Sequence, residues 1–146
     1  MPENSMPAFQ KALSLGVPTL ELDLQVTKDR VLVVYHDPRL NPTLCVYDDG
    51  RKVRKELMER LTFDGLADID CGRRRNSRFP EQQTVPGTRI PRLETVLKLA
   101  RDAGYPVRLS IEIKWQRRGD GLTLERFAQR LVALINEYGL ESRTIV

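Results

Sequence analysis

The chain has 146 residues, with 24 Lys plus Arg and 20 Asp plus Glu, which gives a formal charge of +4. This length suits one domain with a real core, and an apolar fraction of 40% argues against disorder. The longest purely apolar run, residues 31–34, falls far short of the roughly 18 residues that cross a bilayer, so a membrane protein is excluded. One histidine and two cysteines are too few for a zinc site of about four such ligands.

An N-terminal helix and a strand open the chain. Asn4 can cap a helix whose apolar residues recur at helical spacing, and Gly16 stands where such a helix ends. Residues 19–24 then alternate strictly between polar and apolar side chains, which predicts a strand.

A second strand and a long irregular stretch follow. The β-branched run at residues 31–35 predicts a strand that stops at residues 36–38, because proline donates no ladder hydrogen bond. From residue 38 to about residue 91 turn residues dominate, so we expect a long excursion on the surface with a short helix near residues 55–61.

The excursion contains the cysteines and two basic clusters. Cys45 and Cys71 form either one disulfide or two free thiols, depending on the compartment. The basic clusters at residues 51–55 and 73–78 have scarcely any interleaved aromatic residues, so solvated loops are favoured over a nucleic-acid interface.

Regular patterns return in the last third of the chain. Residues 93–103 carry the apolar stripe of an amphipathic helix, and residues 107–114 alternate as a strand. Residues 123–139 predict a third helix, and residues 144–146 the beginning of another strand. Strands that alternate with helices indicate βαβ units around a parallel sheet, and the chain looks cut at both ends.

The predicted strands carry acidic residues on one face. Glu21 and Asp23 alternate with leucines, and Glu112 and Lys114 alternate with isoleucines. If the apolar faces pack on helices, the three carboxylates converge where an unpaired charge is costly, and their oxygen atoms favour Mg²⁺ or Ca²⁺. Lys114 beside such an ion would help to hold a phosphate. The alternative is that these charges lie on the solvated face of an edge strand.

His36 is the only histidine in the chain. It is either a general acid or base, or a strand-end histidine bonded to a backbone carbonyl. Its place at the carboxyl end of a strand favours a functional role, because the sites of parallel α/β folds lie at such ends.

Taken together, these segments resemble the glycerophosphodiester phosphodiesterase family. The matching pieces, in chain order, are Pro2-Glu3-Asn4-Ser5, Glu21-Leu22-Asp23-Leu24, Thr27-Lys28-Asp29, the run at 31–34 with His36-Asp37, Ile90-Pro91-Arg92-Leu93-Glu94 and Ile111-Glu112-Ile113-Lys114. Each piece is weak, but the ordered set is highly specific.

The resemblance implies an α/β fold, a TIM-type (β/α)8 barrel, of which residues 1–146 are an incomplete segment with residues 38–91 as the family insertion. It implies hydrolysis of glycerophosphodiesters, a small-molecule substrate, to an alcohol and glycerol 3-phosphate. The implied Ca²⁺ or Mg²⁺ ligands are Glu21, Asp23 and Glu112. His36 matches one of two catalytic histidines, Lys114 matches a residue beside the phosphate, and Glu3 matches a position near the site.

The chain departs from the family pattern at its ends. The family's other catalytic histidine lies in an H-R-G motif before P-E-N, whereas this chain begins at Met1, and a whole barrel needs about 250 residues. We therefore expect the chain as written to be nearly inactive. Two alternatives are a non-catalytic half barrel that binds anionic partners through its basic loop, and a related lyase that acts on choline phospholipids. Family members occur in both cytoplasm and periplasm, so the resemblance leaves the compartment open.

Overall fold

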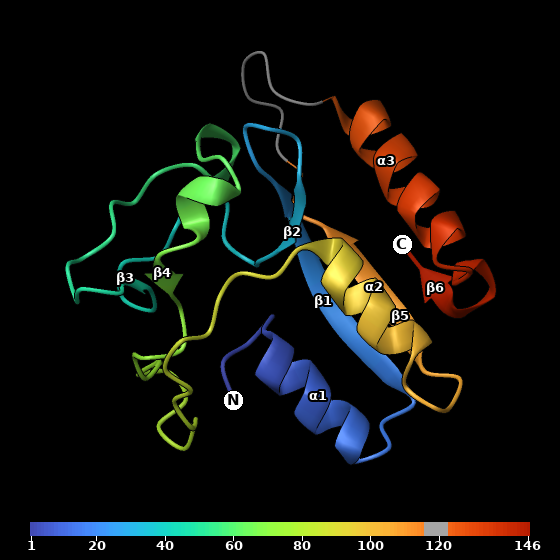
Figure 1. Ribbon diagram of the computed structural model, residues 1–146, viewed down its shortest axis with the longest axis horizontal. Coiled ribbons are helices and arrows are strands. Elements are labelled where there is room, and N and C mark those ends of the chain that lie inside the picture. The colour runs from blue at the N-terminus through green and yellow to red at the C-terminus, as the bar shows by residue number, and fades with distance from the viewer. Residues whose placement is uncertain (116–122) are drawn as a thin grey trace.

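A mixed four-stranded sheet in the order β2-β1-β5-β6 forms the centre of the computed structural model, which describes residues 1–115 and 123–146 (Figure 1). β1 (Thr19–Val26) pairs in parallel with β5 (Arg108–Ile113), and β5 pairs in parallel with β6 (Thr144–Ile145). β2 (Leu32–Val34) runs antiparallel to β1. The predicted parallel arrangement is confirmed for β1, β5 and β6.

The direction of β2 corrects the argument that placed His36 at the carboxyl end of a parallel strand. Only residues 27–31 separate β1 from β2, whereas a parallel crossover needs about a dozen residues or more. β2 therefore returns along β1, and the backbone N–H of Tyr35 donates to the carbonyl of Asp23 at 2.9 Å. This return brings His36 back beside the middle of β1.

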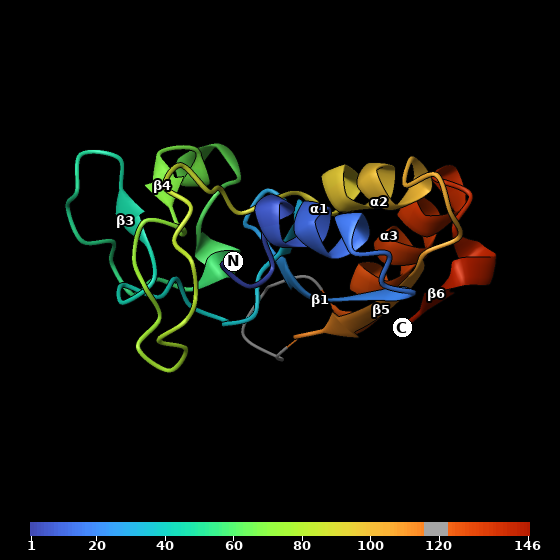
Figure 2. The same ribbon diagram turned by 90° about the horizontal axis from the view of Figure 1, so that it is seen from below.

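Three helices, α1 (Met6–Ser14), α2 (Leu93–Arg101) and α3 (Leu124–Glu137), pack against the apolar face of the sheet. Figure 2 shows α1 and α2 on one side of the strands. The core joins the leucines of β1 to apolar residues of all three helices. Its fully buried members include Leu22, Leu24, Leu93, Leu97, Leu109, Phe127 and Leu131. The opposite face of the sheet carries charged side chains, among them Glu21, Asp23 and Glu112.

The N-terminal cap of α1 differs from the prediction by one residue. Ser5, not Asn4, precedes the helix, and its Oγ accepts a hydrogen bond from the backbone N–H of Ala8 at 3.3 Å. Asn4 has a positive φ of 51°, and its side chain points to the sheet instead. The predicted end at Gly16 is confirmed, since Gly16 has the φ of 71° that follows many helices.

Residues 38–91, which we call the lobe, lie at one end of the sheet (Figure 1). They form most of a second hydrophobic core, to which Val33 and Tyr35 also contribute, so the expectation of a surface excursion is wrong. β3 (Val46–Tyr47) pairs antiparallel with β4 (Ile69–Asp70), and the lobe core includes Leu40, Cys45, Val53, Met58, Leu66 and Ile69. Where a short helix was predicted near residues 55–61, a 3₁₀ turn spans Met58–Arg60.

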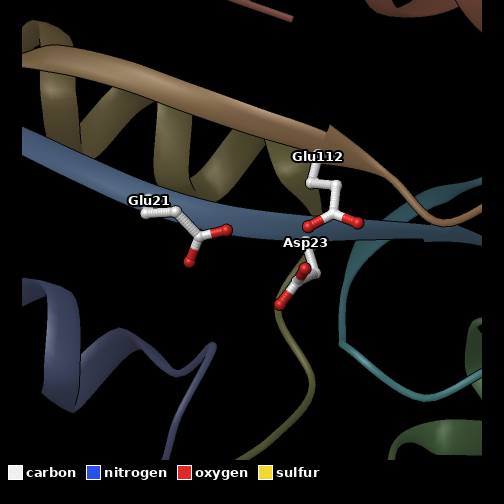
Figure 3. A group of neighbouring side chains, drawn as sticks. All are labelled: Glu21, Asp23 and Glu112. Atoms are coloured by element: carbon white, nitrogen blue, oxygen red, sulfur yellow. The ribbon is translucent and has the colours of Figure 1, made fainter.

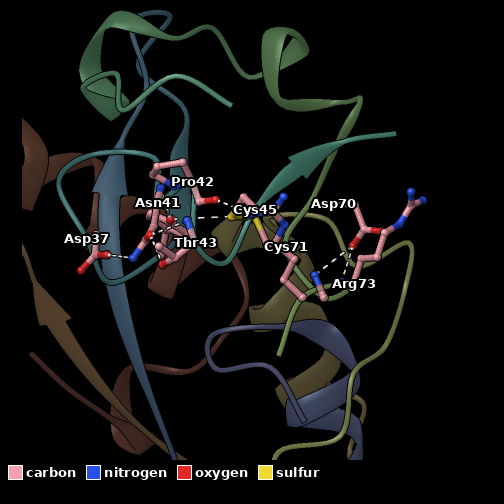
Figure 4. The surroundings of a disulfide bond; sticks show 11 residues. Asp37, Asn41, Pro42, Thr43, Cys45, Asp70, Cys71 and Arg73 are labelled. Atoms are coloured by element: carbon pink, nitrogen blue, oxygen red, sulfur yellow. Dashed lines mark hydrogen bonds and ion pairs between the residues drawn. A yellow bond between two sulfur atoms is a disulfide. The ribbon is translucent and has the colours of Figure 1, made fainter. Parts of the chain in front are cut away.

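A disulfide joins Cys45 to Cys71 and links the two strands of the lobe (Figure 4). It selects one of the two alternatives that the sequence left open. Part of the basic cluster is also structural: Arg73 pairs with the fully buried Asp70 at 3.2 Å, and Arg74 donates to the carbonyl of Pro42 at 2.9 Å. These two arginines stabilise the lobe and are more than solvated charges.

The described residues form part of an α/β fold, with helices on one face of the sheet and polar groups on the other. This arrangement is the one found in part of a TIM-type barrel. Within the described residues the sheet stays open, with β2 and β6 as its two edge strands. Among these residues we find no helix with the length and apolar character needed to span a membrane.

Candidate metal and phosphate site

Glu21, Asp23 and Glu112, which we call the carboxylate cluster, lie on the polar face of the sheet (Figure 3). Glu21 and Asp23 are two residues apart on β1, so both point to the same face. The parallel register sets Asp23 opposite Glu112 of β5. One carboxylate oxygen of each residue lies within 4.8 Å of the others. The structure thus brings together the three carboxylates that the sequence predicted as metal ligands.

The environment of the carboxylate cluster is graded from buried to exposed. The side chain of Asp23 is 8% exposed, whereas that of Glu112 is 59% exposed. The pKa of Glu21 is raised above its ordinary value, first because the group is partly buried and then because Asp23 and Glu112 add negative charge beside it. The charged form of Glu21 is therefore disfavoured unless a cation compensates.

Lys114 supplies part of that compensation. Its Nζ lies 2.6 Å from an oxygen of Glu112 and 3.2 Å from an oxygen of Asp23. The hydrogen bond to Glu112 is the main cause of a raised pKa of Lys114, so the amine stays charged. Lys114 thus lies beside the carboxylate cluster, and its contact with a phosphate stays a prediction.

The carboxylate cluster fits a divalent cation by its chemistry. All of its donors are carboxylate oxygens, which hard ions such as Mg²⁺ and Ca²⁺ prefer. Three carboxylates against one lysine leave an excess of negative charge, which after partial burial is the next cause of the raised pKa of Glu21. A bound cation would relieve that repulsion.

His36 is held by a chain of hydrogen bonds. Its Nδ1 lies 2.9 Å from Asp37 Oδ1, and Asn41 Nδ2 donates to Asp37 Oδ2 at 3.0 Å. The bond to Asp37 is the largest cause of a raised pKa of His36, with the charge of Asp23 adding to it. The alternative expectation, a ring bonded to a backbone carbonyl, is wrong, because the ring nitrogen pairs with a carboxylate. With Nδ1 engaged, the other ring nitrogen can exchange a proton with a substrate.

Two side chains that position this site were missed by the sequence analysis. Gln25 is buried and donates from Nε2 to the backbone carbonyl of His36 at 3.0 Å. Its place two residues beyond Asp23 on the polar face of β1 was a usable signal. Asn4 contacts Asp23 through two hydrogen bonds, and no local pattern connects residues 19 positions apart.

A small cavity lies between residues 2–5, the His36-Asp37 pair and the disulfide. Glu3, predicted to lie near the site, is exposed and lines this cavity. The cavity therefore connects the N-terminal segment and the lobe with His36.

Three converging carboxylates, a lysine between two of them and an oriented histidine are side-chain chemistry suited to holding a divalent cation and a phosphate on the polar face of an α/β sheet. The family model of the glycerophosphoryl diester phosphodiesterase family matches residues 1–145, and the chain belongs to this family. The expected family is thus confirmed.

Individual relatives agree with the family match. A glycerophosphodiester phosphodiesterase from Caldanaerobacter subterraneus is 33% identical over 147 aligned residues, which cover 100% of this chain and 52% of that protein. A solved structure from Silicibacter pomeroyi assigned to this family superposes with a TM-score of 0.89 at 27% identity, over 99% of this chain and 52% of its own. The chain spans about half the length of these relatives.

A third similarity concerns a structure with a bound product. An Oleispira antarctica phosphodiesterase, solved in complex with sn-glycerol-3-phosphate, superposes with a TM-score of 0.66 at 20% identity, over 94% of this chain and 47% of its own. At this identity the likeness establishes a shared fold.

Proposed function

We propose that the protein containing this chain hydrolyses glycerophosphodiesters to an alcohol and glycerol 3-phosphate with the help of Ca²⁺ or Mg²⁺. The observation that carries this proposal is the convergence of the carboxylate cluster and Lys114 on one face of the sheet, with His36 near enough for the charges of Asp23 and Lys114 to act on it. The family supports the reaction class, and the Oleispira complex with sn-glycerol-3-phosphate supports the identity of one product.

Each group has a distinct part in the proposed reaction. The carboxylate cluster holds the cation, which would offset the negative charge of the phosphate when bound. Lys114 contributes a second positive charge to the phosphate oxygens. His36 exchanges a proton with the attacking or the leaving oxygen through the ring nitrogen that Asp37 leaves free. Hydrolysis needs an opposite proton transfer, which we assign to a second acid–base group outside this set.

The experiment uses the natural full-length protein and glycerophosphocholine as substrate. We expect turnover that stops with EDTA and returns with Mg²⁺ or Ca²⁺, and free glycerol 3-phosphate among the products. Glu112→Gln, which removes one charged ligand of the cation, should reduce the rate strongly, and His36→Gln should reduce it by about 10²–10⁴-fold. Glu141→Gln, an exposed acidic residue outside the carboxylate cluster, serves as the control.

Two results would contradict the proposal. Turnover at an unchanged rate in EDTA, or in Glu112→Gln, would exclude a role for the carboxylate cluster. A cyclic phosphate in place of a free monoester would instead assign the protein to the lyases that act on choline phospholipids.

A further inference from the structure

Asn4 makes a two-point contact with Asp23 across the polar face of β1. Asn4 Nδ2 donates to Asp23 Oδ2 at 2.7 Å, and the backbone N–H of Asp23 donates to Asn4 Oδ1 at 3.0 Å. The amide of Asn4 therefore bonds both the carboxylate and the backbone of Asp23. Two hydrogen bonds to one residue fix the rotation of the Asp23 side chain as well as its distance from Asn4.

The backbone of Asn4 is adapted to this contact. Its φ of 51° lies in the left-handed region, which asparagine tolerates better than most residues other than glycine. A residue keeps such a conformation when its surroundings determine it strongly. Here the next residue is fixed as well: Ser5 is buried, caps α1, and donates from Oγ to the carbonyl of Pro2 at 2.6 Å.

The two oxygens of Asp23 have different partners. Asn4 bonds Oδ2, while Lys114 Nζ approaches Oδ1 at 3.2 Å, on the side of Glu112. The amide of Asn4 is neutral, so it orients the carboxylate without cancelling its charge. Oδ1 is consequently the oxygen of Asp23 that lies on the side of Lys114, which also pairs with Glu112.

We infer that Asn4 is a positioning residue that presents Asp23 to a divalent cation held by the carboxylate cluster. This inference rests on the proposed function, because it requires that the carboxylate cluster binds a metal. Outer partners of metal ligands typically change metal affinity about 10–100-fold when they are replaced. Asn4 thus links the N-terminal turn before α1 to the metal affinity of the sheet.

The test compares metal binding by calorimetry, with Mg²⁺ alone and Ca²⁺ alone, in the full-length protein and in three variants. Asn4→Gly removes the amide and keeps the positive φ without strain. Asn4→Ser retains a small polar side chain that is too short to reach the carboxylate, and it serves if the glycine variant does not fold. Ser5→Ala is the matched control, since it weakens the same turn and does not touch Asp23.

We expect the dissociation constant of the metal to rise about 10–100-fold in Asn4→Gly and Asn4→Ser, and to change less than about threefold in Ser5→Ala. The upward shift of the thermal midpoint that the metal produces should shrink in the two Asn4 variants only. Activity on glycerophosphocholine should be reduced at limiting metal and recover at saturating metal.

The outcomes separate this inference from the proposed function. Equal metal affinity in the unaltered protein and in a folded Asn4 variant would overturn the role of Asn4 and leave the metal site standing. An equal loss of metal affinity in Ser5→Ala would overturn the inference, because it would show that the integrity of the turn, and not the contact of Asn4 with Asp23, determines metal affinity. If the unaltered protein binds neither metal, both the metal site and the role of Asn4 are refuted.

Discussion

Asp70→Asn should destabilise the lobe strongly. Asp70 is fully buried and accepts four hydrogen bonds. Its Oδ1 accepts the backbone N–H groups of Gly72 and Arg73 at 2.9 and 3.1 Å, and its Oδ2 accepts the N–H of Gly87 at 2.7 Å and Arg73 Nε at 3.2 Å. Figure 4 shows the pairing with Arg73. This single carboxylate connects β4 to the turn at residue 87.

The cost can be estimated from the bonds that asparagine cannot make. Its carbonyl oxygen can keep the two bonds of Oδ1, but its NH₂ group would face two donors in place of Oδ2. A hydrogen bond to a charged group contributes about 1.5–3 kcal/mol, so the loss of two predicts about 3–6 kcal/mol. That is a large part of the roughly 5–15 kcal/mol by which domains are stable.

The effect should depend on pH with a defined sign. Burial acts to raise the pKa of Asp70, but the hydrogen bonds from Gly87, Gly72 and Arg73 outweigh it, and the pKa lies below its ordinary value. A lowered native pKa means that the stabilisation is fully present above the unfolded pKa of about 4 and is lost as the pH falls through the native pKa. The difference between the unaltered protein and Asp70→Asn should therefore be largest at neutral pH.

The assay is guanidinium unfolding followed by circular dichroism, at pH 7 and at pH 3. Asp68→Asn, an exposed neighbour on the same segment, is the control and should change stability by less than about 0.5 kcal/mol. A loss below about 1 kcal/mol for Asp70→Asn at pH 7, or a loss that is the same at both pH values, would refute this reasoning.

Three further predictions concern the disulfide, a glycine and the histidine. Replacing Cys45 and Cys71 by serine should cost about 3.5 kcal/mol, from the loop of 26 positions that the disulfide closes, and an unchanged thermal midpoint would contradict this. Gly72→Ala should lower the free energy of unfolding in guanidinium by about 1–3 kcal/mol, because the added Cβ would collide with the backbone carbonyl of Val85. Full retention of stability would show that the turn can move aside. Asp37→Asn should lower the pKa of His36 in an NMR titration, because the Asp37 carboxylate is the main group that raises this pKa. The charged ring should then disappear at a lower pH than in the unaltered protein. An equal or higher pKa of His36 would contradict the pairing.

Short-range patterns predicted much of the fold. The alternation in residues 19–24 separated the buried leucines of β1 from Glu21 and Asp23, and the stripe in residues 93–103 predicted α2. These predictions succeed because the side-chain periods of strands and helices are local properties of the backbone. The same alternation predicted the carboxylate cluster, since Glu112 lies on an equivalent strand.

Predictions that depended on distant partners were less successful. The interpretation of residues 38–91 as a surface excursion failed because their core forms from scattered apolar residues without a regular period. The cap at Asn4 was assigned to the wrong residue, since asparagine and serine are both good caps and only the contact with Asp23 distinguishes them.

The sequence by itself determined which side chains of a strand share a face, and therefore which carboxylates and which lysine were candidates for the site. His36 was a candidate because it is the only histidine and follows a predicted strand. Only the tertiary structure decided that β2 returns antiparallel beside β1, that Cys45 pairs with Cys71, and that Asn4 holds Asp23. The physical reason is range: a periodic pattern reports the direction of a side chain within its own element. Its partner from another element is selected by packing and hydrogen bonding across many residues, and that selection leaves no local trace.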